Sequence, residues 1–60
     1  MYNFSEVLNE EQIVLLKKYN VPLECERNID AVWNTIQKLT DQTPLTEEIE
    51  ILADTLLDNI

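Results

Sequence analysis

The absence of glycine is the feature that most restricts how this chain can fold. Its 60 residues contain no glycine and only two prolines. Tight β-hairpins need glycine or asparagine at positive φ, so a turn-rich β fold is disfavoured. Apolar residues make up 45% of the chain, which is ordinary for a folded domain and too high for a disordered acidic tail. The composition therefore predicts helices joined by short connections in one domain spanning residues 1–60.

Signals at both ends predict a first helix over residues 10–19. Asn9 is suited to the N-cap position, and Gln12 follows at the spacing of a capping box. Leu8 and Ile13 occupy the positions of a hydrophobic staple. The residues ahead of this helix are too apolar for a loose tail, so the N-terminal segment is expected to fold back and close one end of the core. Its apolar members are Tyr2, Phe4, Val7 and Leu8.

A second helix is predicted after the break at Pro22, because the residue before a proline avoids helical backbone angles. It enters between Leu23 and Asn28 and ends near Leu39 or Thr40. Apolar side chains recur along it every three or four residues, which is the period of a helix with one buried face. These side chains are Cys25, Ile29, Val32, Ile36 and Leu39, with Trp33 at the edge of the stripe.

A third helix is predicted from Pro44, or from just after Thr46, with Thr43 or Thr46 as its cap. Its apolar arc reaches the last residue, which predicts that the core uses the whole C-terminal segment. The arc consists of Leu45, Ile49, Leu52, Ala53, Leu56, Leu57 and Ile60. The predicted fold is all-α: a compact three-helix bundle with roughly antiparallel neighbours and a short N-terminal segment packed on it.

The first third of the chain resembles the opening of a group of known proteins. The resemblance rests on Phe4-Ser5, Leu8, Glu10-Glu11-Gln12-Ile13, Leu16-Lys17-Lys18-Tyr19 and Val21. These residues are similar to the start of short, acidic, uncharacterised helical proteins of Gram-positive bacteria and their phages or other mobile elements. Such proteins often close the first helix with glycine, where this chain has Asn20. The resemblance implies a small accessory factor of a mobile element and assigns no catalytic or binding residues.

Enzymatic chemistry is disfavoured by the residues that are missing. There is no histidine to serve as a general base near neutral pH, and without glycine there is no glycine-rich phosphate loop. Cys25 has no histidine partner and falls on the predicted apolar stripe, so we expect it to be a small buried hydrophobe. No segment has the spacing of a calcium loop or a Cys/His metal site. The sequence predicts no catalytic activity, no cofactor and no dedicated metal site.

The compartment is predicted from the same composition. One cysteine cannot form an internal disulfide, which favours a reducing environment. The N-terminal segment has neither a basic region nor a long apolar run, so no signal peptide and no membrane span are expected. We therefore expect a cytoplasmic protein.

Charge is the feature most informative about function. Twelve acidic residues stand against four basic ones, for a net charge of −8. Such a surface repels phosphate backbones and anionic lipids, so direct binding to nucleic acid or membranes is disfavoured. The last third of the chain has no basic residue and six acidic ones, namely Asp41, Glu47, Glu48, Glu50, Asp54 and Asp58.

On the predicted third helix, carboxylates form a stripe opposite the apolar arc. The members are Glu47, Glu50, Asp54 and Asp58, spaced three or four residues apart, with apolar Ile51 inside the stripe. One interpretation is a solvated face that keeps a small protein soluble. The other is a row of charges that imitates phosphates, with Ile51 as an apolar anchor, and that occupies a basic channel on a target protein.

Two further apolar residues leave alternatives open. Trp33 is expected in the core, because a small bundle needs its largest side chain there, although its place at the edge of the stripe also suits a contact with a partner. Val14 lies away from the apolar face of the first helix and marks either a second contact patch or nothing. Ile51 has similar alternatives, since it can pack on the N-terminal segment or on a second copy of the chain.

The sequence favours a non-catalytic acidic module that binds a protein with a basic surface. The leading hypothesis is inhibition of a basic nucleic-acid-handling protein, with Glu47, Glu50, Ile51, Asp54 and Asp58 as the binding residues. The alternative is a small regulatory or structural module that self-associates as a homodimer or docks on a partner through apolar helix patches. A DNA-binding helix-turn-helix is disfavoured, because the helix that would enter the groove has no basic residue.

Overall fold

The fold is mostly helical, as the composition predicts, with a small sheet that the sequence did not predict. A computed structural model describes all 60 residues. The elements in chain order are β1 (Tyr2–Asn3), the 3-10 helix η1 (Phe4–Glu6), α1 (Glu10–Lys18), β2 (Glu24–Cys25), α2 (Ile29–Thr40) and α3 (Glu47–Asp58). The predicted all-α class is therefore right for the three helices and incomplete for the strand pair.

Helix α1 begins at a complete capping box, which confirms the sequence prediction. The backbone N–H of Gln12 donates to Asn9 Oδ1 at 2.9 Å, and the backbone N–H of Asn9 donates to Gln12 Oε1 at 2.9 Å. Each bond satisfies a backbone donor that has no partner within the helix. Because Gln12 is also buried, this cap fixes where the helix starts against the core.

Helix α1 is terminated by Asn20, which follows the C-cap Tyr19 and whose φ of 58° places it in the left-handed region. The N–H of Val21 donates to the carbonyl of Leu16 at 2.9 Å, and the N–H of Asn20 donates to the carbonyl of Lys17 at 3.1 Å. These two bonds are those of a Schellman motif, in which an apolar contact brackets the turn. Val21 and Leu16 are both buried and provide that contact.

The chain returns from α1 along an extended segment that pairs with the N-terminal residues. Strands β1 and β2 are antiparallel, with Tyr2 opposite Cys25 and Asn3 opposite Glu24. The N–H of Phe4 extends the pairing by donating to the carbonyl of Leu23 at 2.8 Å. Cys25 therefore lies in a strand and is half-buried, which corrects its predicted place on the second helix.

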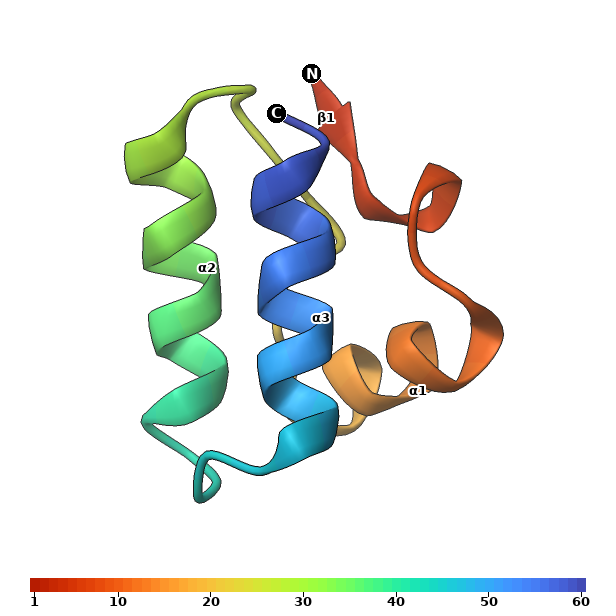
Figure 1. Cartoon of the computed structure of the whole chain (residues 1–60), viewed down its shortest axis with the longest axis vertical. Helices are drawn as coiled ribbons and strands as arrows, with labels where there is room; N and C mark the ends of the chain where they lie inside the picture. The colour runs from red at the N-terminus through yellow and green to blue at the C-terminus, as the bar shows by residue number, and fades with distance from the viewer.

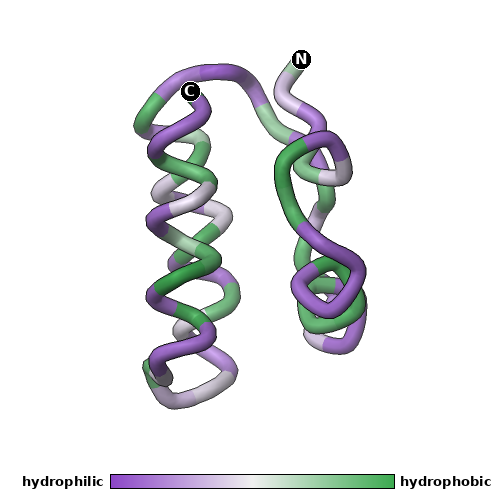
Figure 2. The backbone as a smooth tube through the Cα atoms, turned by 45° about the vertical axis from the view of Figure 1, so that its right-hand side comes forward, coloured by the Kyte–Doolittle hydropathy of each residue, from purple (hydrophilic) through white to green (hydrophobic).

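The helices do not form a simple antiparallel bundle. Helices α2 and α3 run antiparallel, whereas α1 lies across the end of the pair at which α3 begins (Figure 1). Residues 1–25 all lie on one side of the α2–α3 pair (Figure 2). The prediction of three roughly antiparallel neighbours is wrong for α1. The chain between α1 and α2 is extended, and it runs from α1 to the opposite end of the α2–α3 pair, where α2 starts.

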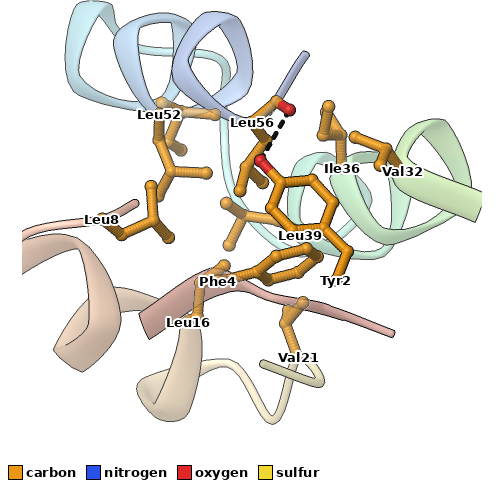
Figure 3. Close-up of a cluster of buried hydrophobic side chains, with 11 residues drawn as sticks. Tyr2, Phe4, Leu8, Leu16, Val21, Val32, Ile36, Leu39, Leu52 and Leu56 are labelled. Atoms are coloured by element: carbon orange, nitrogen blue, oxygen red, sulfur yellow. Dashed lines mark hydrogen bonds between the residues drawn. The ribbon is translucent and has the colours of Figure 1, made fainter. Parts of the chain in front are cut away.

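The core is built around the N-terminal segment, as its apolar residues predicted. Tyr2 and Phe4 are fully buried, and their rings pack edge to face with 5.1 Å between the ring centres (Figure 3). The Tyr2 hydroxyl donates to the carbonyl of Leu56 at 2.8 Å, so its one polar atom is satisfied inside the core. Around these rings pack buried side chains from all three helices and their connections: Leu8, Leu16, Val21, Val32, Ile36, Leu39, Ile49, Leu52 and Leu56.

Four residues predicted for the core are at the surface instead. The exposed fractions are 57% for Ile29, 51% for Trp33, 64% for Leu45 and 42% for Ile60. Ile29 is the first residue of α2, while Leu45 and Ile60 lie outside the ends of α3. At the end of the core next to Leu56, Tyr2 fills the space, so the apolar arc of α3 is buried only from Ile49 to Leu56.

Candidate protein-binding surface

The predicted binding residues all lie on the outer surface of α3. Thr46 caps the helix by accepting from the N–H of Ile49 at 3.4 Å, and this cap orients the first turn. The carboxylates at 47, 50, 54 and 58 are exposed, and Ile51 is 52% exposed among them. Over the twelve residues of α3 the four carboxylates extend along about 16 Å, at a rise of about 1.5 Å per residue.

The two ends of this acidic stripe differ in what they do for the helix itself. Three glutamates in the first turn, at 47, 48 and 50, lie where the helix dipole favours negative charge. The dipole has the opposite sign at Asp58, and no basic residue is present in the last turn. Helix stability thus accounts for the acidic N-terminal turn, but it does not account for Asp58.

An apolar groove lies between α2 and α3, and it meets the acidic stripe at Glu50 and Asp54. Its volume is about 480 Å³, within the range of about 300–1,000 Å³ that binding clefts occupy. Both helices and the connection between them contribute to its lining, which consists of Trp33, Ile36, Gln37, Thr40, Leu45, Glu50, Ala53, Asp54 and Leu57. Trp33 and Leu45 are the most exposed apolar side chains of this lining.

A second, shallower hollow lies where α1 meets the start of α3. Its lining combines three carboxylates with one apolar residue: Glu10, Glu11, Glu48 and Val14. Val14 is 58% exposed, so the residue that the sequence left open as a contact patch does lie at the surface. The hollow has a volume of about 440 Å³ and is open to solvent, and only one of its four lining residues is apolar.

The structure divides the predicted stripe between different surroundings. Glu50 and Asp54 line the α2–α3 groove, whereas Glu47, Ile51 and Asp58 line neither hollow. Sequence reasoning placed Leu45 in the core and favoured the core for Trp33 over a contact with a partner, so it did not group the two with this surface. The available signal was the position of Trp33 at the edge of the apolar stripe, but which edge faces α3 depends on how the two helices pack.

All four basic residues of the chain lie outside both hollows. The guanidinium of Arg27 lies 4.6 Å from the centre of the Tyr2 ring and donates to the carbonyl of Asn59 at 2.9 Å. The Nζ atom of Lys18 lies 5.6 Å from the centre of the Tyr19 ring. The α2–α3 groove therefore carries carboxylates with no cation in its own lining.

Metal binding and membrane insertion are the two other properties that the arrangement of side chains bears on. No group of three or more His, Cys, Asp or Glu side chains is arranged to hold a metal ion. No helix combines the length and hydrophobicity that crossing a lipid bilayer requires. Cys25 makes a local contact only, since its thiol donates to the carbonyl of Glu26 at 3.2 Å.

Comparison of the chain with known protein families, with characterised proteins and with solved structures gave no match. The candidate surface is therefore described from the chain's own residues. It consists of the acidic outer face of α3 (Glu47, Glu50, Ile51, Asp54 and Asp58) and the apolar groove that adjoins it.

Proposed function

We propose that this protein is a non-catalytic acidic module that binds, and thereby inhibits, a nucleic-acid-handling protein with a basic surface. The observation that carries the proposal is the placement of Asp54 and Asp58 on the exposed face of α3. Asp58 lies in the last turn, where its charge opposes the helix dipole, and Glu50, Asp54 and Asp58 repel one another at spacings of four residues. Charges that cost the helix stability suggest selection for something outside the helix.

A basic channel that normally holds a nucleic-acid backbone is the partner that this face suits. Carboxylates along α3 present a row of negative charge, and their summed field would steer a basic protein into contact at a high association rate. Ile51, half-exposed among them, supplies an apolar contact within the charged surface. The N-terminal residues resemble those of phage and mobile-element proteins, and inhibition of a host enzyme is a role that suits an accessory factor of such an element.

The proposal is tested by reversing charge on α3. In Asp54→Lys/Asp58→Lys the new lysines lie in the C-terminal half of the helix, with Lys at 54 four residues after Glu50, so α3 should remain folded. We expect immobilised wild-type protein to retain a basic nucleic-acid-binding protein from a Gram-positive bacterial lysate at low salt. The double variant should lose it, and added duplex DNA should release it from the wild type.

A matched control separates a specific face from general charge. Glu6→Lys/Glu24→Lys makes the same change in net charge at exposed positions of η1 and β2, outside α3 and outside both hollows. This variant should retain the captured protein nearly as well as the wild type. Equal loss in both double variants, or capture that survives reversal on α3, would contradict the proposal.

A second function is favoured by one specific observation, the exposed apolar side chains of the α2–α3 groove. Trp33 and Leu45 are each more than half exposed, and tryptophan is common among the residues that dominate protein interfaces. A regulatory or structural module that self-associates or docks through this groove would bind with little dependence on salt. Binding of a basic partner through the acidic face loses affinity steeply as ionic strength rises, so the salt dependence of binding distinguishes the two functions.

A further inference from the structure

The α2–α3 groove combines an apolar floor with a negative edge. Five of its nine lining residues are hydrophobic, and its only charged residues are Glu50 and Asp54. Those two residues are four apart on α3, so they lie one above the other on the same side of the helix. The groove runs along two antiparallel helices whose other side is covered by residues 1–25 (Figure 2).

This geometry suits a third helix laid against the pair. Amphipathic helices bind in apolar grooves through side chains at positions i, i+3, i+4 and i+7, while their polar side chains meet the rim. On α2, Ile29 precedes Trp33 by four residues and is also more than half exposed, which continues the apolar surface by one turn. Leu45 marks the opposite end, just before the N-cap of α3.

The charge of the groove decides between a basic partner and a second copy of this chain. The two copies of a homodimer would each carry a net charge of −8 and would bring Glu50 and Asp54 close to the same carboxylates of the other copy. Like charges that face each other across an interface disfavour association. A partner with Lys or Arg beside its apolar residues gains from the same carboxylates.

We propose that the α2–α3 groove receives a basic amphipathic helix of the partner protein. Its apolar residues pack on Trp33 and Leu45, and its basic residues pair with Glu50 and Asp54. The inference rests on the proposed function, since it takes the partner to be basic. It adds that the contact is a helix in a groove, with an apolar centre and a charged edge, rather than a row of charges alone.

Trp33 is the single tryptophan of the chain and lines the groove, so its fluorescence reports directly on occupancy. The probe is a synthetic peptide of about 18 residues, long enough to form a helix, with leucine on one face and lysine on the other. We expect a saturable shift of Trp33 emission to shorter wavelength. A scrambled peptide of the same composition should bind at least about tenfold more weakly, because it cannot present one apolar face.

Two neutralising variants test the negative edge. Glu50→Gln/Asp54→Asn keeps the shape of the groove, and we expect it to weaken peptide binding by about tenfold or more. Glu6→Gln/Glu24→Gln removes the same charge from exposed positions away from the groove and should bind the peptide within about twofold of wild type. Equal weakening in both variants, equal binding of the scrambled peptide, or the absence of a saturable shift would overturn the inference.

One more variant separates this inference from the proposed function. Leu45→Ser removes an apolar residue that is 64% exposed, so it should leave the fold and every carboxylate in place. We expect this variant to bind the peptide about tenfold more weakly and to capture less of the lysate protein. If capture is lost in Asp54→Lys/Asp58→Lys but unchanged in Leu45→Ser, the acidic face binds the partner and the groove does not.

Self-association through the α2–α3 groove would contradict the inference that the groove receives a helix of another protein. Sedimentation of the protein alone should give a monomer across the concentrations used for the titration. A dimer whose formation shifts Trp33 emission in the absence of peptide would assign the groove to a second copy of the chain.

Discussion

Tyr2 makes contacts with three separate parts of the molecule. Its ring is fully buried against Phe4, and the guanidinium of Arg27 lies over its face at 4.6 Å. Its hydroxyl donates to the carbonyl of Leu56 in the last turn of α3. One side chain thus joins β1, the core and α3. A buried phenol of this kind makes the stability of the domain sensitive to alkaline pH.

The alkaline limit of stability should depend on Tyr2. Burial raises the pKa of its phenol above the ordinary value of 10.0, with the charge of Arg27 acting in the opposite direction. Because the native pKa exceeds that of the unfolded chain, the stabilisation is complete below about pH 10 and is lost as pH rises through the native pKa. The free energy of unfolding, measured in denaturant, should therefore decline as the pH rises above about 10.

The Tyr2→Phe variant is the control for that decline. It removes the titrating group and the bond to Leu56, at an expected cost of about 1 kcal/mol near neutral pH. Its stability should fall less than that of the wild type between about pH 9.5 and 11, so the difference between the two proteins shrinks. Parallel curves would show that Tyr2 does not govern the alkaline limit.

At the scale of elements, the features that local sequence determines were predicted well. The capping box of α1 was predicted from the spacing of Asn9 and Gln12, because both partners lie within one turn. The strand pair was not predicted, since Tyr2 and Cys25 are distant in sequence and neither short strand has an alternating pattern. The acidic stripe was predicted from helical spacing, but the groove beside it depends on the packing of α2 against α3.

The end of α1 provides a prediction at the same scale. Asn20 adopts a left-handed conformation that glycine accepts without steric cost and that alanine disfavours by about 1 kcal/mol. Asn20→Gly should keep or raise the midpoint of thermal unfolding, whereas Asn20→Ala should lower it. Equal losses in the two variants would assign the effect to the asparagine side chain rather than to the backbone.

At the scale of the whole molecule, unbalanced charge opposes a small core. A net charge of −8 on 60 residues produces self-repulsion in the folded state. A chain of this size buries only about 60% of the surface that its unfolded form exposes, so its margin of stability is small. Repulsion should therefore have a measurable effect on unfolding.

The melting temperature should rise with moderate salt. Raising the ionic strength from about 0.01 to 0.15 M shortens the screening length from about 30 to 8 Å, which weakens repulsion between carboxylates. In Asp54→Lys/Asp58→Lys each substitution replaces a negative charge with a positive one, so the net charge changes from −8 to −4 and the rise in melting temperature should be smaller. Calorimetry at both salt concentrations measures the difference. Identical melting temperatures for the wild type would show that its carboxylates are too dispersed to matter.

The bond between Tyr2 and Leu56 has a consequence for biosynthesis. It spans 54 positions, and it brings the two termini to the same end of the molecule (Figure 1). On the ribosome, Tyr2 and Phe4 emerge well before α3, the helix that covers them. Until then the two aromatic rings have no complete core to enter. The nascent chain must therefore wait for α3, so this domain completes its fold only after α3 has left the exit tunnel.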